Sequence, residues 1–420
     1  MKGFDSISAS VTPTVVVVGG GASGLVAAGM AARRGLRVIV LERNRRMARK
    51  LLITGKGRCN ITNNCDVSDF IANVPQNGRF LYSSLGAFNP QDMMQILTEQ
   101  GLELKTERGN RVFPKSDKAR DVVDALVGFA RNAGSKFLTG RATNLLLDNG
   151  YCSGVQTETG EKIMSDAVVV CTGGLSYPLT GSTGDGYALA KQAGHTVIPP
   201  RPSLVPLESS DKWCADVQGL SLRNCAIKVI DIKNKKIIFE DFGEMLFTHF
   251  GVSGPMVLSA SAHMRQMQPN RYQLLIDLKP ALSAEKLDAR LIRDLVENKN
   301  REFANSLGAL LPHSLCPVVV SLSGIAPDTR CHSITKEQRR QLGKILKALP
   351  VNISGFRPIE EAIITSGGVK VSEINAKTMQ SKLVKGLYFA GEVLDVDAYT
   401  GGFNLQIAFS TGAAAGNNVG

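Results

Sequence analysis

The chain has 420 residues, of which 43% are hydrophobic and 20% are charged. This length exceeds the usual size of one domain, and the composition excludes a disordered or fibrous protein, so we expect two or three globular domains. The N-terminal stretch "MKGFDSISASVTPTVVVVGG" has an early acidic residue and a short apolar run, which fit neither a secretion signal nor a membrane span. We therefore expect a cytoplasmic protein that does not bind a membrane.

The formal net charge of +12 is concentrated in one segment. Residues 33–58 hold ten Lys and Arg residues and a single acidic residue, Glu42. A basic excess can indicate nucleic acid, but this one lies beside glycine-rich segments, where a bound phosphate compound would need it. A solvated basic surface remains the alternative for Arg33, Arg34, Arg45 and Arg46.

The eight cysteines contain no C-x-x-C pair and no zinc-ligand spacing. We interpret them as reduced thiols and expect no metal site.

The first informative segment in chain order is "TVVVVGGGASGLVAAGMAARRGLRVIVLER". A continuous β-branched run predicts a strand buried in a parallel sheet, and an alanine-rich helix ending near Gly35 and a strand over residues 36–41 follow it. Between the first strand and the helix stands Gly19-x-Gly21-x-x-Gly24, and Glu42 closes the second strand. This context predicts a dinucleotide site, with the phosphates at the helix N-terminus and Glu42 on the ribose hydroxyls.

Two later strands also end in glycines. "AVVVCTGGLSYPLTGSTGDGY" places Thr172, Gly173 and Gly174 after an apolar strand, and we expect its Asp185 to be a turn or cap residue. "GLYFAGEVLDVDAYTGGFNLQ" ends a strand at Gly391-Glu392 and then opens a second glycine-led helix. Three such strands, the first and last more than 370 residues apart, favour FAD over NAD as the bound dinucleotide.

The loop "LLITGKGRCNITNN", residues 51–64, can be a phosphate loop, a metal site or a reactive thiol. A Walker loop is excluded because Gly57 stands where Ser or Thr is required, and a metal site because no second ligand has the right spacing. Gly57 permits a close backbone approach, Arg58 supplies a permanent cation, and the Asn60 amide can both donate and accept. We expect Cys59 to be a small buried residue rather than a nucleophile. His249 and Tyr399 are further candidates for acid–base chemistry, although a lone histidine between aromatic residues, such as His249, is more often a packed or hydrogen-bonded side chain.

The chain resembles the BaiN/RdsA-type NAD(P)/FAD-dependent oxidoreductases, a flavoprotein family that includes aminoacetone-oxidase-like members. The resemblance rests on "GGGASGL", "RKLLITGKGRCNITN", "RVFPKSDKARDVVDAL", "TGGLSYPLTGSTGDGY", "PSLVPL", "GEMLFTHFGVSGPMVLSAS", "TSGGV" and "SKLVKGLYFAGEVLDVDAYTGGFNLQ", which span almost the entire chain. One departure is Ala48, where the resemblance implies glycine.

Motifs and resemblance together give the predicted site. The expected cofactor-binding residues are Gly19, Gly21, Ala22, Ser23, Gly24, Glu42, Arg43, Arg49, Lys50, Gly57, Arg58, Cys59, Asn60, Ala142, Thr172, Gly173, Gly174, Gly391, Glu392, Gly401, Gly402, Phe403, Asn404, Leu405 and Gln406. The candidates for catalysis are Arg58, Cys59, His249 and Tyr399.

The predicted fold class is α/β: a Rossmann-like FAD-binding domain interrupted by an inserted β-barrel-like domain and a helical section. The proline-rich stretch "HTVIPPRPSLVPLESS" predicts a linker, alternating strands follow it, and amphipathic helices begin at Ser283. We therefore expect the FAD-binding domain at 1–196 and 353–420, the β-rich insertion at 197–280 and the helical section at 281–352.

The expected function is FAD-dependent reduction of an activated C=C or C=N bond in a small organic substrate, with NAD(P)H as electron donor and co-substrate. An amine oxidase-like flavoenzyme that uses oxygen is the first alternative. A non-catalytic flavin sensor or nucleic-acid-associated protein is the second, although no nucleic-acid partner is expected because no aromatic-rich stripe accompanies the basic segment.

Overall fold

The computed structural model describes residues 12–420, so part of the N-terminal stretch interpreted above lies outside the described residues. The chain divides into two compact units, one of residues 1–202 and 363–420 and one of residues 203–362. No helix in the described part of the chain is long and apolar enough to cross a membrane.

The first unit is built around a parallel five-stranded sheet in the order β19-β10-β1-β2-β6. Its strands are β1 (Thr14–Val18), β2 (Arg37–Glu42), β6 (Lys136–Thr139), β10 (Ala167–Val170) and β19 (Leu387–Phe389). The three glycine-terminated strands predicted above, β1, β10 and β19, are therefore neighbours. The valines of β1 and β10 are almost fully buried, as expected for central strands of a parallel sheet.

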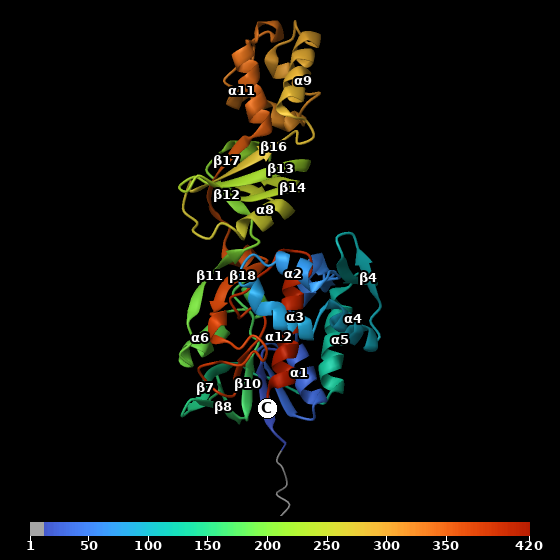
Figure 1. The fold of residues 1–420 in the computed structure, drawn as a ribbon, viewed down its shortest axis with the longest axis vertical. Coiled ribbons are helices and arrows are strands. Elements are labelled where there is room, and N and C mark those ends of the chain that lie inside the picture. The colour runs from blue at the N-terminus through green and yellow to red at the C-terminus, as the bar shows by residue number, and fades with distance from the viewer. Residues whose placement is uncertain (1–11) are drawn as a thin grey trace, which may run out of the picture. The chain divides into compact units, whose positions relative to one another are not determined.

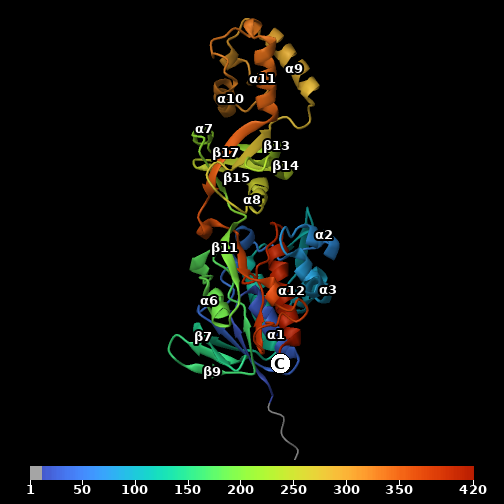
Figure 2. The same cartoon turned by 60° about the vertical axis from the view of Figure 1, so that its left-hand side comes forward.

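Helix α1 (Ala22–Arg33) packs against α12 (Phe403–Asn418) and α5 (Ala119–Asn132). Helices α1 and α12 lie side by side in both views (Figure 1, Figure 2). Close packing of α1 on the sheet depends on Gly24, because a Cβ there would lie 1.9 Å from the carbonyl oxygen of Gly19. The other helices of this unit are α2 (Val67–Ala72), α3 (Tyr82–Ala87), α4 (Pro90–Glu99) and α6 (Asp185–Gln192).

Three small sheets complete the first unit. They comprise β3 (Thr62–Asn63), β5 (Arg111–Pro114) and β4 (Leu104–Glu107); β7 (Ala142–Asp148), β8 (Tyr151–Thr157) and β9 (Lys162–Met164); and β11 (Val197–Ser203) with β18 (Ile364–Val369). The proline-rich stretch predicted as a linker does cross from one unit to the other, after Pro202. Its first part also forms β11, since a two-stranded edge tolerates prolines that a central strand would not.

The second unit contains a closed six-stranded barrel, which confirms the predicted β-barrel-like insertion in a Rossmann-like α/β fold. Its strands are β12 (Leu207–Ser209), β13 (Ser221–Asp231), β14 (Lys236–Thr248), β15 (Gly251–Ser253), β16 (Tyr272–Asp277) and β17 (Leu349–Phe356). Its helices are α7 (Trp213–Asp216), α8 (Pro255–Ser261), α9 (Ala284–Glu297), α10 (Cys316–Ser323) and α11 (Lys336–Lys347). Ser283 caps α9 as predicted, because its hydroxyl accepts from the backbone N–H of Lys286.

The boundaries between the units differ from the predicted ones at 196/197 and 352/353. Residues 349–356 form β17, which closes the barrel between β12 and β16, and the side chains of Leu349, Val351 and Ile353 are fully buried in its core. The chain therefore returns to the first unit only after Ala362.

Candidate functional site

A cavity of about 350 Å³ lies in the first unit, at the carboxyl ends of the central strands. Residues that follow each of the five strands line it, among them Gly19 after β1, Glu42 at the end of β2, Arg141 after β6, Thr172 after β10 and Glu392 after β19. Ligands of open parallel sheets bind at this edge, where the connections diverge to opposite sides. The strands that supply the cavity are therefore those that the glycine motifs identified, together with β2 and β6.

Most of the predicted site residues are brought together at this cavity. It is lined by Gly19, Gly21, Ala22, Ser23, Glu42, Arg43, Arg49, Lys50, Asn60, Ala142, Thr172, Gly173, Glu392, Tyr399, Gly401, Gly402, Asn404 and Leu405. The lining does not include Gly24, Gly57, Arg58, Cys59, Gly174, Gly391, Phe403, Gln406 or His249.

Two helices begin at the cavity with a glycine and without a side-chain cap. Gly21 precedes α1 and Gly402 precedes α12, and no side chain accepts a hydrogen bond from either first turn. Each helix start therefore presents uncapped backbone N–H groups and the positive end of a helix dipole. A Cβ at Gly21 would meet no atom within 4 Å, which leaves the backbone open to a close ligand.

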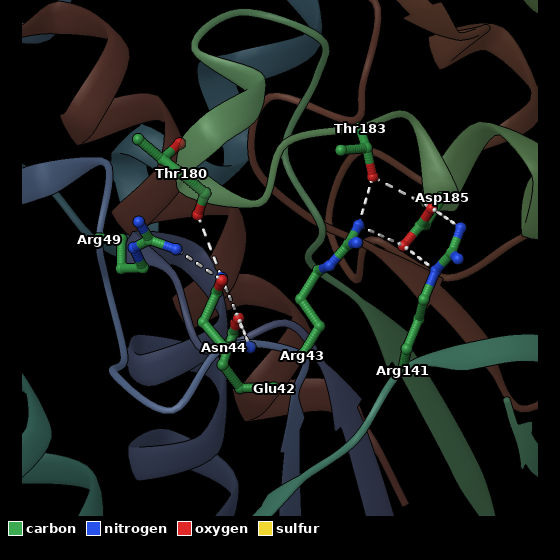
Figure 3. Close-up of polar contacts among 8 residues, drawn as sticks. All are labelled: Glu42, Arg43, Asn44, Arg49, Arg141, Thr180, Thr183 and Asp185. Atoms are coloured by element: carbon green, nitrogen blue, oxygen red, sulfur yellow. Dashed lines mark hydrogen bonds and ion pairs between the residues drawn. The ribbon is translucent and has the colours of Figure 1, made fainter. Parts of the chain in front are cut away.

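Glu42 is buried, with 7% of its surface exposed, and its carboxylate is held by hydrogen bonds. One oxygen accepts from the backbone N–H of Gly20 at 2.8 Å, and the other accepts from the backbone and side-chain N–H groups of Asn44 at 2.9 and 2.7 Å. The guanidinium of Arg49 in turn donates to the Asn44 amide oxygen at 2.9 Å (Figure 3). Asn44, which the sequence motifs did not identify, thus orients the acidic residue that they did.

Asp185 does more than the turn or cap role predicted for it. As the first residue of α6, it accepts two hydrogen bonds from Arg141, at 2.9 and 2.7 Å, and one from Arg43 at 3.1 Å (Figure 3). Burial raises the pKa of the Asp185 carboxyl, but the hydrogen bond and charge of Arg141 and the charge of Arg43 outweigh burial, so the net pKa is lowered. Asp185 is therefore an anion that joins the loops after β2, β6 and β10.

Lys50 and Glu392 form an ion pair at another part of the cavity wall. The Lys50 ammonium lies 2.6 Å from one oxygen of Glu392 and 2.5 Å from the hydroxyl of Ser176. The other oxygen of Glu392 accepts from the Ser176 hydroxyl and from the backbone N–H of Thr365, both at 2.9 Å. Lys50 and Glu392 are 342 residues apart. Ser176 and Thr365 lie within the motifs "TGGLSYPLTGSTGDGY" and "TSGGV", but neither was among the predicted site residues.

The loop of residues 54–60 has the unusual backbone that its glycines suggested. Lys56 and Cys59 have φ of 58° and 59°, a left-handed conformation that is rare for residues with a side chain and is often kept at functional sites. Ala48, where the resemblance implied glycine, also has a positive φ of 53°. When the Asn60 amide is oriented so that its oxygen and nitrogen both have partners, its oxygen accepts at 3.1 Å from the backbone N–H of Gly402 at the start of α12.

Two predicted residues of this loop point away from the cavity. The guanidinium of Arg58 forms ion pairs with Glu107 and Asp117 and lies over the ring of Phe113 at 4.1 Å. Cys59 is fully buried, and burial raises the pKa of its thiol to about 12. A direct cofactor contact by Arg58 or Cys59 therefore has no geometric support, since their side chains are committed to other neighbours.

The two remaining catalytic candidates lie in different units. Tyr399 lines the cavity, and its backbone N–H donates to the carbonyl of Asn73. His249 is an exposed residue of the turn between β14 and β15 in the barrel unit, and its ring contacts Phe250 with 5.0 Å between the centroids. Of these two, Tyr399 is the residue that the structure places at the cavity.

A buried hydroxyl at the cavity wall lacks an intramolecular partner. Thr172 Oγ1 is one of the buried side-chain atoms that have no hydrogen-bond partner within residues 12–420, and Thr172 lines the cavity. Buried polar groups are nearly always satisfied, so this hydroxyl fits a bound polar ligand. Together with the two uncapped helix starts and the buried Glu42, it matches the chemistry of a dinucleotide.

Comparison with known proteins gives matches over nearly the full chain. Residues 13–418 match the family described as HI0933-like protein Rossmann domain. The chain is 31% identical over 405 residues to the 3-dehydro-bile acid delta(4,6)-reductase of Clostridium scindens, covering 95% of this chain and 97% of the relative. It is 30% identical over 405 residues to the ribosomal RNA dihydrouridine synthase of Escherichia coli, covering 96% and 97%.

A solved structure shares the fold. The 3-ketosteroid delta1-dehydrogenase of Sterolibacterium denitrificans aligns with a TM-score of 0.51 at 13% identity, covering 97% of this chain and 99% of that one. At this identity the likeness concerns the arrangement of the elements.

Proposed function

Because the chain belongs to the HI0933-like Rossmann family, we propose that it is an FAD-dependent oxidoreductase that reduces a C=C bond conjugated to a carbonyl group. The observation that carries this proposal is the meeting of two uncapped helix starts, α1 and α12, at one cavity beside the buried Glu42. One helix N-terminus serves a pyrophosphate. A second one, from the other end of the chain, suits the pyrimidine edge of a flavin, which a nicotinamide dinucleotide lacks.

In this proposal each part of the cavity holds one part of FAD. Glu42 accepts hydrogen bonds from the ribose hydroxyls, and the first turn of α1 holds the pyrophosphate. Thr172 Oγ1 donates to the bound cofactor, and Gly401 and Gly402 allow it to approach the start of α12 closely. The bound flavin supplies the transfer of two electrons as a hydride from a donor to the substrate.

The proposed reaction class follows from what the names of the two relatives, from Clostridium scindens and Escherichia coli, have in common. A delta(4,6)-reductase and a dihydrouridine synthase are both named for the saturation of C=C bonds in a ring. Addition of hydride to such a bond needs a proton at the neighbouring carbon. We assign the donation of this proton to Tyr399. Of the two acid–base candidates from the sequence, Tyr399 is the one that lines the cavity, and a phenol is protonated at neutral pH.

The electron donor in this proposal is NADH or NADPH. The test is to purify the protein, identify its flavin by absorbance and mass, and follow bleaching near 450 nm without oxygen on addition of NADH, NADPH or a panel of amines. We expect FAD in about one copy per chain and rapid bleaching by a nicotinamide. Bleaching by amines alone would support the oxidase alternative, and a colourless protein that cannot take up FAD would contradict the proposal.

A second candidate is the same reduction on uridine bases of RNA, which would replace the small-molecule substrate expected from the sequence. It is supported by the 30% identity over almost the whole length of the dihydrouridine synthase. Mass spectrometry of ribosomal RNA from cells with and without the gene measures dihydrouridine directly. Loss of dihydrouridine on deletion supports this candidate, and an unchanged content together with turnover of small enones contradicts it.

A further inference from the structure

The segment of residues 173–184, here called the strap, runs from the end of β10 to the start of α6 along the cavity. Gly173, Thr180, Gly181 and Ser182 of the strap line the cavity. Leu179, at its outer surface, is 88% exposed, although leucine is usually buried. The strap therefore has residues that line the cavity and one apolar residue, Leu179, that faces solvent.

The strap is fastened on the Glu42 side of the cavity by residues that follow β2. The side-chain amide of Asn44 donates to the carbonyl of Thr180 at 3.1 Å, and Arg43 donates to the hydroxyl of Thr183 at 2.5 Å (Figure 3). Asn44 also binds the Glu42 carboxylate. The residue that orients the predicted ribose acceptor therefore also holds the strap.

Asp185 fixes the C-terminal end of the strap. It immediately follows the strap, and its carboxylate takes three hydrogen bonds from Arg43 and Arg141, which come from the loops after β2 and β6. Only 14% of the Asp185 side chain is exposed, whereas the two arginines are partly solvated. Hydrogen bonds between charged groups are stronger than neutral ones, so Asp185 is a strong tie at the C-terminal end of the strap.

The strap also packs closely against Asn44 at Gly181. A Cβ at Gly181 would lie 2.5 Å from the side-chain nitrogen of Asn44, and the φ of Gly181 is +110°. A side chain at this position would push Asn44 away from Thr180 and from Glu42. Gly181 is therefore a second, uncharged point at which the strap can be loosened.

We propose that the strap closes the adenosine end of the cavity over FAD and that Asp185 is the positioning residue that keeps it closed, so that FAD leaves only when Asp185 releases Arg43 and Arg141. This inference rests on the proposed function for the identity of the cofactor. Asp185 does not take part in the chemistry; it acts through Arg43, Arg141 and the strap. Its loss should therefore change how long FAD stays bound and leave the flavin absorbance spectrum unchanged.

The test compares Asp185→Asn with Asp117→Asn in the purified FAD-bound protein. Asp117 is a matched control, because it also bridges two cations, Arg58 and Lys105, but does not line the cavity. Release of FAD after dilution is followed by the rise in flavin fluorescence. We expect the dissociation rate constant to rise at least about tenfold in Asp185→Asn, the effect of losing one charge-assisted hydrogen bond, and to stay within about twofold of wild type in Asp117→Asn.

Two further measurements separate the strap from a general loss of stability. The thermal midpoint of the FAD-free protein should be the same for Asp185→Asn and Asp117→Asn. Gly181→Ala, which changes no charge, should also accelerate FAD release. If Asp185→Asn does not fold, the release rate of Gly181→Ala alone tests whether the strap retains FAD. Wild-type release rates in both Asp185→Asn and Gly181→Ala would overturn the strap alone, whereas a wild-type protein without FAD would overturn the proposed function.

Discussion

Cys59 shows how one residue can attract attention by its sequence context and have a different role in the structure. Arg58 and Lys56 beside it would favour a thiolate, yet its side chain is fully buried. Burial raises the pKa of the thiol to about 12, so the thiolate is nearly absent at neutral pH. The physical setting of Cys59 is that of a small packed residue.

We therefore expect Cys59→Ala to retain activity within about twofold of wild type and to bind FAD normally, because alanine fills most of the same space. Steady-state turnover and flavin content of the variant measure this. Cys65→Ala is the control, since Cys65 is half-buried and its loss leaves the cavity lining intact. A Cys59→Ala protein that holds FAD but turns over at less than 1 part in about 1,000 of wild type would contradict this account, because an effect of that size is typical of losing a group that takes part in the chemistry.

At the scale of elements, a buried histidine, His195, lies just after α6 and connects this helix to the segment that follows β18. The His195 ring is fully buried, with one nitrogen 3.1 Å from a carboxylate oxygen of Glu373 and the other 2.7 Å from the hydroxyl of Ser381. Burial lowers the pKa of His195, and the Glu373 carboxylate opposes this effect only in part. The native state therefore keeps this imidazole neutral at pH values at which an unfolded chain would bind a proton.

The sign of the resulting pH dependence follows from this difference. An unfolded histidine binds a proton below its ordinary pKa of about 6.5, and the folded His195 does so only at lower pH. Its contribution to the free energy of unfolding is thus complete above about pH 6.5 and is lost as the pH falls below that value. We expect the urea midpoint to fall less between pH 7.5 and pH 5.5 in His195→Gln than in wild type. His249→Gln, which removes an exposed imidazole, should follow the wild-type pH dependence, and an equal fall in all three proteins would refute this assignment.

Elements with a local signal could be predicted from the sequence. The turn after β1, Glu42 at the end of β2 and the glycines before α12 are each encoded within a few residues, and the structure has them at one cavity. The hydrogen bonds from Asn44 to Thr180, from Arg141 to Asp185 and from Ser176 to Glu392 could not be found in this way, because the partners are distant in the chain. Arg58 was expected at the cavity because the sequence does not show its ion-pair partners. Glu107 and Asp117 lie 49 and 59 residues further along the chain, on β4 and after β5.

At the scale of the whole molecule, the two-part composition of the first unit explains why FAD rather than NAD was predicted. Residues 1–202 supply β1, β2, β6 and β10, and residues 363–420 supply β19 and α12. The second boundary was predicted ten residues too early because "ISGFRPIEEAIITSGGV", which starts at residue 353, was interpreted as the return to the first unit, whereas its first residues complete β17. Only its pairing with β12 and β16 assigns it to the barrel.

The most direct test of the central claim is to reduce the flavin of the purified protein without oxygen and then add possible electron acceptors. The acceptors are a steroid 4-en-3-one, 2-cyclohexen-1-one, its saturated counterpart cyclohexanone, and ribosomal RNA that lacks dihydrouridine. The account predicts that at least one C=C acceptor restores the flavin absorbance and gains two hydrogens, and that cyclohexanone does neither. Reoxidation by oxygen alone, with no saturated product from any of these acceptors, would contradict it.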